Sequence, residues 1–392
     1  MKNKPVRFLA IVSHSLGEFD VLFPFFARLK SQQSVEVKII VAVKKVYDQY
    51  QASPFLQYCG QSLKIDVRHF KIPNKFDSLG RTSLLLSETR LGRKILHLWV
   101  RGAGLFRAPV LFRSLISSDY YMHEVSNQIQ TTRILYVFNF LLKKPILTYH
   151  HGPGVVKTTA VTKPIKHANL TTHLSFHEHN RETLSKLGFI SQIEIGYPQF
   201  FPEWQQLVSK FVELKGEVNK SIVIFTRHVS QAYLDQNDYD YLLKTSFEVI
   251  REKYGDILIV VKPHPRQDTL LLRKTLRSLG FGNFEVSAEH AAVLSKNANL
   301  VIAFFGSTIL HSLSVGAPAI EYNIEAKNFR KSEFEGSPYK NLGIHSAECK
   351  NELREFFEEV LQARYVRPEI VEDLARKRRF AIGRFNKFVV EK

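Results

Sequence analysis

The sequence predicts an α/β protein with two parallel-sheet domains in tandem. Short, mostly β-branched apolar runs alternate with amphipathic segments in strict order through the second half of the chain, and less regularly through the first half. Such alternation is typical of right-handed βαβ units. The 392 residues are also long for one hydrophobic core, so two domains of about 200 residues each are expected.

In the first half, the periodicity predicts a strand, a helix and a second strand before residue 45. Residues 133–151 read as a passage from a helix into a strand. Strands are expected at 6–14, 35–43, 169–176 and 192–198, and helices at 19–32 and 178–188.

The second half has the clearer pattern, and its periodicity restarts after a polar stretch. Strands are expected at 221–227, 256–265, 283–289, 299–307 and 318–323, with helices at 238–255, 269–280, 290–298 and 307–316. These elements predict two Rossmann-like domains, at 1–205 and 220–367, joined by a linker at 206–219. Residues 368–392 are expected to form a basic helix that packs back across both domains.

The formal net charge of +18 is the strongest bulk signal. It suits nucleic acid, an anionic membrane or a phosphorylated substrate, and it can also serve solubility alone. No nucleic-acid module is recognisable. Basic residues interleaved with aromatic ones favour the membrane surface, although Trp99 and its neighbours could equally be core residues. The two such segments contain Lys94, Trp99, Arg101 and Arg107, and Arg376, Lys377, Arg378, Arg379 and Phe380.

The two cysteines, Cys59 and Cys349, form no disulfide framework and suit a reducing compartment. No apolar stretch reaches the length of a membrane span. We therefore expect a cytoplasmic protein that can associate peripherally with the inner face of the cytoplasmic membrane.

One predicted strand ends in an unusual turn, KPHPR at 262–266. Ligands of open parallel sheets bind outside the carboxyl ends of the strands. Pro263 and Pro265 stiffen the backbone around His264. A histidine held this way beside Lys262 and Arg266 can donate to a phosphate or a carboxylate. The alternative is a histidine in an ordinary proline-rich loop.

Other predicted strands end in turns of similar chemistry. Arg227 follows the strand at 221–227, and Glu321 lies in the strand at 318–323. Gly306 lets a ligand approach the backbone, while Ser307 and Thr308 open a helix, either as a plain cap or as part of an anion site. Because such turns converge at one edge of a parallel sheet, a phosphate site is favoured.

The order KPHP, a Gly-Ser-Thr turn about forty residues later, and SVGAPAIEY resembles the nucleotide-binding half of GT-B glycosyltransferases. The likeness is greatest to bacterial capsule and lipopolysaccharide enzymes with an HP motif, including sialyltransferases, Kdo transferases and CDP-glycerol glycerophosphotransferases. HHGPG at 150–154 and IEIGYP at 193–198 support it in the first half. The acidic D/E-D/E-G motif of the sialyltransferases is not clearly present.

The resemblance implies an enzyme with a central cleft between its domains, which works without a bound metal or other cofactor. It implies a CMP- or CDP-linked nucleotide-sugar donor, and a glycan or glycolipid acceptor. His264 with Pro265 would hold the donor phosphate, and Ser307 and Thr308 would lie beside it. From the sheet geometry, we add Arg227, Lys262 and Gly306 to the donor site, and Glu321 as a candidate for the ribose hydroxyls.

The acceptor needs a base that takes its hydroxyl proton. The first strand ends in the turn SHSLGEFD, which holds Glu18, Asp20 and His14, in our order of preference. The alternative is that Glu18 or Ser15 only caps the following helix. The cluster His173, His177, Glu178 and His179 has metal-like spacing, but a strand end followed by a solvated helix start explains it better.

Three rival functions remain open. One is a CDP-polyol phosphotransferase of cell-surface polymer synthesis. A second is an isomerase similar to UDP-GlcNAc 2-epimerase, which shares the two-domain shape. The third is a non-catalytic basic protein that binds anionic polysaccharide. A scaffold of this last kind has no need for site-like chemistry at three strand ends.

Overall fold

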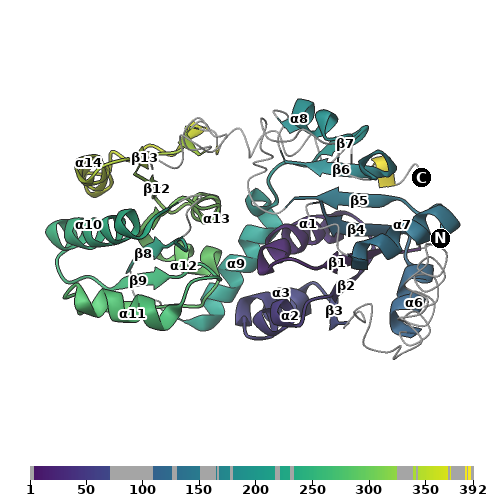
Figure 1. The fold of residues 1–392 in the computed structure, drawn as a ribbon, viewed down its shortest axis with the longest axis horizontal. Coiled ribbons are helices and arrows are strands. Elements are labelled where there is room, and N and C mark those ends of the chain that lie inside the picture. The colour runs from purple at the N-terminus through teal and green to yellow at the C-terminus, as the bar shows by residue number, and fades with distance from the viewer. Residues whose placement is uncertain are drawn as a thin grey trace, which may run out of the picture.

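The computed structural model contains two parallel sheets, each flanked by helices, which confirms the predicted α/β fold of two Rossmann-like domains (Figure 1). No helix in the described part of the chain is both long and apolar enough to cross a membrane. The residues that the structure describes are 4–70, 109–125, 130–150, 165, 167–176, 180–216, 221–229, 234–324, 339–340, 343–369, 371, 385 and 387–389.

The first sheet has the strand order β3-β2-β1-β4-β5-β6-β7, and all of its pairs are parallel. The order reverses beside β1, so the turn after β1 opens at a switch point of the kind that binds ligands. The strands are β1 (Val6–Val12), β2 (Val35–Val41), β3 (Asp66–His69), β4 (Tyr120–Glu124), β5 (Ile146–Tyr149), β6 (Thr171–Ser175) and β7 (Ser191–Glu194).

Helices cover both faces of this sheet. The apolar face of the first helix packs on the sheet, and residues 19–32 are helical as predicted. The helices are α1 (Phe19–Gln32), α2 (Lys44–Gln51), α3 (Pro54–Ser62), α6 (Pro109–Ser117), α7 (Gln130–Leu142) and α8 (Asn180–Lys186), with short 3-10 turns at Leu16–Glu18, Ala168–Leu170 and Pro198–Phe200.

The second sheet has the order β10-β9-β8-β11-β12-β13, and its switch point lies between β8 and β11. Its strands are β8 (Ser221–Phe225), β9 (Ile259–Lys262), β10 (Phe284–Val286), β11 (Ala298–Ala303), β12 (Ala319–Tyr322) and β13 (Ser346–Ala347). Its helices are α10 (Gln236–Tyr254), α11 (Thr269–Ser278), α12 (Ala291–Lys296), α13 (Thr308–Ser314) and α14 (Lys350–Leu361).

Helix α9 (Pro202–Lys215) lies between the two sheets (Figure 1). Its buried side chains, Trp204 and Phe211 among them, belong to one apolar cluster that contains residues of both domains. The predicted linker, 206–219, therefore begins inside a helix. The exact domain boundaries remain a prediction.

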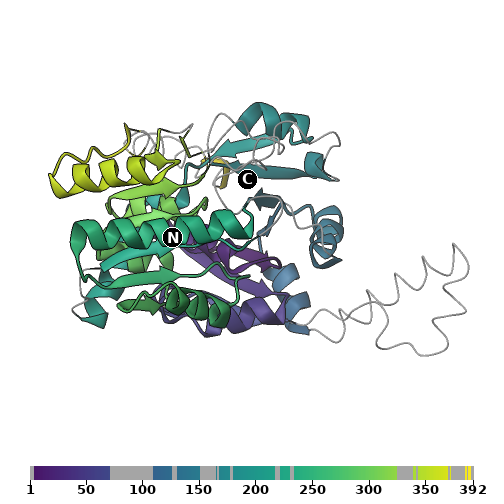
Figure 2. The same ribbon diagram turned by 60° about the vertical axis from the view of Figure 1, so that its left-hand side comes forward.

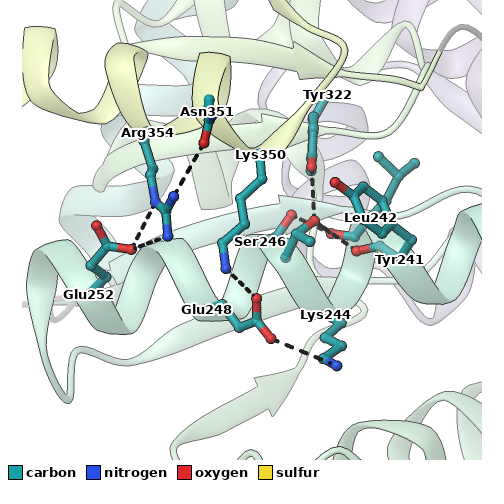
Figure 3. A network of polar contacts seen from close by, with 11 residues as sticks. Tyr241, Leu242, Lys244, Ser246, Glu248, Glu252, Tyr322, Lys350, Asn351 and Arg354 are labelled. Carbon is teal, nitrogen blue, oxygen red and sulfur yellow. Dashed lines mark hydrogen bonds and ion pairs between the residues drawn. The ribbon is translucent and has the colours of Figure 1, made fainter.

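Helices α10 and α14 lie on the outer side of the second domain (Figure 2), and charged side chains join them (Figure 3). Lys350 Nζ lies 2.5 Å from Glu248 Oε2, and Arg354 Nη2 lies 2.9 Å from Glu252 Oε2. Single exposed pairs contribute little to stability. Together with the apolar contacts of the two helices, this row fixes α14 across one face of the sheet.

The described residues near the C-terminus pack on the first domain (Figure 1). Phe385 is fully buried, with its ring 5.2 Å from that of Phe25 on α1, and Tyr120 Oη donates to the carbonyl oxygen of Val389. The two basic segments assigned to a membrane lie outside the described residues, because they fall within 71–108 and 372–384.

Candidate functional site

The turn after β1 is organised by the carboxylate of Glu18. Its Oε1 accepts the backbone N–H groups of Ser13, His14 and Ser15 at 3.1, 2.6 and 3.1 Å, and its Oε2 accepts the hydroxyl of Tyr149 at 3.2 Å. The side chain is fully buried, whereas His14 is exposed. Glu18 therefore holds the turn together, and the chain next enters α1 with Asp20 in its first turn.

Asp20 reaches the second domain. His290 Nε2 lies 2.7 Å from Asp20 Oδ1, and His311 Nε2 lies 3.4 Å from Asp20 Oδ2. His290 caps the N-terminus of α12, and His311 lies on α13. Both imidazoles are buried, and Phe55 and Trp204 pack against the ring of His290. One carboxylate of the first domain is thus shared by two histidines of the second.

The protonation states follow from this burial. Burial by itself would raise the pKa of Asp20, but attraction and hydrogen bonding to His290 and His311 outweigh it and hold that pKa well below its usual range. Burial lowers the pKa of His290, and Asp20 offsets this only in part. At neutral pH the pair is therefore a carboxylate and a neutral imidazole.

The ligand atoms of Asp20, His290 and His311 lie within 4.8 Å of one another, close enough to hold a metal ion. The hydrogen bonds of His290 argue against one. Its Nδ1 accepts the N–H of Ala292 at 3.2 Å, so the ring proton sits on Nε2, which faces Asp20. A metal-bound histidine needs the opposite tautomer, with its second nitrogen donating to an acceptor. The tautomer of His290 therefore suits a hydrogen bond to Asp20 and not a metal ion.

In the second domain, the sheet register brings the predicted donor residues to one edge. Lys262, Phe225, Ala303 and Glu321 lie side by side on neighbouring strands, so the turns that follow them share the carboxyl edge. Arg227 crosses the switch point between β8 and β11. Its Nη1 donates to the carbonyl oxygen of Phe305 at 2.5 Å, and its guanidinium stacks 4.9 Å from the Phe305 ring.

His264 is half-buried, and its ring lies 4.5 Å from that of His228. Burial, His228, Arg227 and Arg266 together lower the pKa of His264 to about 4. The imidazole is therefore neutral at pH 7. Its Nδ1 accepts the N–H of Arg266 at 3.2 Å, so Nε2 carries the proton. The donor that the sequence predicted at His264 is therefore a neutral N–H group.

The remaining donor candidates lie around the same edge. Gly306, Ser307 and Thr308 are half-buried, Pro265 is exposed, and Glu321 is fully buried. Burial lowers the pKa of Lys262 to about 8, against the opposing effects of Asp20 and Glu289. Its Nζ donates to the carbonyl oxygen of Ala288 at 3.4 Å.

The structure brings Asp20 to His290 and His311, whereas the carboxylate of Glu18 accepts the backbone N–H groups of its own turn. His290 and His311 were missed by the sequence reasoning. The sequence pattern around these two histidines is weak. His290 directly precedes one short helix, and His311 lies among the apolar residues of the next helix. In the first domain, His173 is buried and contacts His150 and Thr148, at 3.1 Å each. His177, Glu178 and His179 lie outside the described residues.

No protein-family model matches the sequence, and no curated protein matches it. Solved structures do. UDP-GlcNAc 2-epimerase from Methanocaldococcus jannaschii superposes with a TM-score of 0.59 at 12% identity, covering 98% of this chain and 100% of that one. The chain has the GT-B fold.

Two further structures share this GT-B architecture. Glycyrrhiza uralensis UGT73P12, complexed with glycyrrhetinic acid 3-O-monoglucuronide, has a TM-score of 0.55 at 10% identity and covers 99% of this chain and 96% of its own. The S. aureus MnaA–UDP co-structure has a TM-score of 0.52 at 12% identity and covers 94% and 90%. At these identities the likeness establishes the fold alone.

Proposed function

We propose that this GT-B protein is a glycosyltransferase that moves a sugar from a pyrimidine-nucleotide donor to a glycan or glycolipid acceptor. The observation that carries the proposal is the contact of Asp20 with His290 and His311, which joins the turn after β1 to the donor-side domain. Transfer to a hydroxyl requires a proton acceptor next to the site where the donor phosphate departs. The contact places candidate acid–base groups where the turn after β1 meets the donor-side domain.

On the donor side, five side chains support phosphate binding. Arg227 and Lys262 provide positive charge, His264 donates from Nε2, and the hydroxyls of Ser307 and Thr308 lie at the same edge. As the sugar–phosphate bond breaks, the nucleotide leaves with additional negative charge, which these groups stabilise. Glu321 remains our candidate for the ribose hydroxyls.

On the acceptor side, we favour Asp20 over Glu18 and His14. The low pKa of Asp20 makes it a better orienting anion than a proton carrier. We therefore assign the proton to His311, whose Nε2 faces Asp20 and whose Nδ1 has no hydrogen-bond partner among the described residues. Asp20 would then stabilise the imidazolium, as carboxylates do in other acid–base dyads.

Under this proposal, the nucleobase of the donor is cytosine or uracil. The KPHP and Gly-Ser-Thr turns resemble those of enzymes that use cytidine nucleotides, which favours CMP-activated sialic acid or Kdo, whereas the S. aureus neighbour was solved with UDP. A thermal-shift panel of CMP, CDP, UDP, UMP and GDP separates these, because a ligand of the folded state raises Tm with its concentration over Kd. We expect CMP or CDP to give the largest shift.

The Arg227→Ala variant is the control, and it should lose most of that shift. A larger shift with UDP would move the donor to the UDP-sugars and leave the glycosyltransferase proposal intact. No shift with any nucleotide, or an equal shift with GDP, would contradict a pyrimidine-nucleotide donor. The absence of a shift with every nucleotide would also favour the alternative of a polysaccharide-binding protein.

The fold also motivates an isomerase as a second candidate, since the Methanocaldococcus jannaschii neighbour is a UDP-GlcNAc 2-epimerase. Proton NMR of a nucleotide sugar incubated with the protein tests this directly. Epimerisation without an acceptor would identify an isomerase. Release of nucleotide that requires an acceptor would support transfer. A product that carries the donor phosphate would instead identify the CDP-polyol phosphotransferase.

A further inference from the structure

Helix α11 (Thr269–Ser278) has an unusual outer face. It lies on the outer surface of the second domain in both views (Figures 1 and 2). Leu272 and Leu276 face the core, with exposed fractions of 2% and 0%. Leu270 and Leu271, in the first turn, are 79% and 60% exposed. The buried leucines, Leu272 and Leu276, already provide the contact of this helix with the core. The exposure of Leu270 and Leu271 therefore requires another explanation.

Positive charge surrounds these leucines. Between residues 266 and 278 the chain has four cations, Arg266, Arg273, Lys274 and Arg277, and one carboxylate, Asp268. Asp268 is engaged as the helix cap, with its Oδ1 accepting the N–H groups of Leu270 and Leu271 at 2.8 and 3.1 Å. Arg273 is partly covered and donates to the carbonyl oxygen of Val286, whereas the other three cations are exposed.

The helical spacing places charge and apolar surface on one stripe. Leu270, Lys274 and Arg277 are related by i, i+4 and i+7, so their side chains lie along the same face. Leu271 borders that stripe. The stripe protrudes from a helix surface, and a lipid interface accepts protruding leucines without a shaped pocket while its headgroups meet the cations.

We propose that this face of α11, formed by Leu270, Leu271, Lys274 and Arg277, docks on an anionic phospholipid surface. The leucines enter the headgroup layer, and Lys274 and Arg277 meet lipid phosphates. The turn with His264 lies directly before α11, so docking brings the proposed donor edge close to the bilayer. The docking surface does not depend on the proposed reaction. Its consequence, that the acceptor is membrane-borne, does rest on that function.

Vesicle co-flotation tests the surface without any substrate. The wild-type protein is mixed at 50 mM and 500 mM NaCl with vesicles of phosphatidylcholine alone, or with 30% phosphatidylglycerol. We expect flotation only with the anionic vesicles, and its loss at high salt, because exposed charges are screened there. Wild-type protein that stays in the bottom fraction with anionic vesicles at 50 mM NaCl would overturn the proposal.

Two variants separate the contributions. Leu270→Ser/Leu271→Ser should lower vesicle partitioning by about tenfold, because it removes apolar surface that enters the headgroup layer. Lys274→Gln/Arg277→Gln should lower it by roughly tenfold or more, given the usual contribution of each cation near an anionic bilayer. Circular dichroism confirms that each variant is folded.

The matched control removes two exposed leucines elsewhere, Leu214→Ser/Leu361→Ser, and should float like the wild type. Unchanged flotation of the leucine variant, or equal loss in this control, would overturn the assignment to α11. Light scattering adds a last check. If the wild type is dimeric and Leu270→Ser/Leu271→Ser is monomeric, the stripe is a contact between two copies of the chain, and the lipid proposal fails.

Discussion

Asp20 Oδ1 and His290 Nε2 lie 2.7 Å apart, although 270 residues separate them in the sequence. The hydrogen bond joins the first turn of α1, in the first domain, to the cap of α12, in the second. His311 completes the contact from α13. Because both histidines belong to the second domain, any movement of the domains changes the environment of this carboxylate.

Replacing Asp20 with asparagine tests its role as the orienting anion. Asp20→Asn keeps the shape but removes the charge that would stabilise a protonated His311. We expect sugar transfer to fall by about 10²–10⁴, the range of a lost acid–base contribution, with little change in nucleotide affinity. Asp240→Asn, on α10, is the control. Full activity in Asp20→Asn would remove this residue from the chemistry.

Glu18→Gln distinguishes a structural glutamate from a catalytic one. The carboxylate accepts three backbone N–H groups and the Tyr149 hydroxyl. A glutamine side chain would turn its NH2 group toward either the backbone N–H groups or the hydroxyl, and these groups are themselves hydrogen-bond donors. We expect a loss of about 1–3 kcal/mol in the free energy of unfolding, measured by urea denaturation. A variant with wild-type stability and no activity would instead restore Glu18 as the base.

The His264 imidazole should make stability depend on pH. Its pKa is lowered from 6.5 to about 4, so the unfolded chain binds a proton that the folded protein does not. The stability contribution of this group is therefore complete above pH 6.5 and is lost as the pH falls toward 4. His264→Asn keeps an acceptor for the Arg266 N–H and should flatten the fall in Tm between pH 7 and pH 5. An identical pH profile in the variant would contradict a neutral His264 in the folded protein.

Lys262 should give nucleotide binding an alkaline limit. With a pKa lowered to about 8, its ammonium loses the proton within the accessible range, and the attraction for the donor phosphate is lost with it. We expect the Kd of the best nucleotide, measured by calorimetry, to rise roughly tenfold between pH 8 and pH 9.5. Lys262→Met should bind weakly at every pH in this range. A flat wild-type profile would argue that Lys262 does not contact the donor.

Much of the fold could be predicted because its local patterns agree with its tertiary structure. Residues 19–32 combine an apolar face with a clear helical period, and the strand runs before Arg227 and His264 are continuous and apolar. β4 (Tyr120–Glu124) was not identified, although it lies next to β1. Its sequence, YYMHE, is short and carries two polar residues that are buried only because neighbouring strands and helices cover them.

By itself, the sequence determined the α/β class, the convergence of Arg227, Lys262, His264 and Ser307 at one sheet edge, and the set of acidic residues after the first strand. These follow from local periodicity and from the parallel arrangement of βαβ units. Only the tertiary structure showed that Glu18 is held within its own turn, and brought His290 and His311 to Asp20. The physical reason is that hydrogen bonding, burial and pKa depend on the approach of two domains, and no local pattern encodes which side chains meet across that interface.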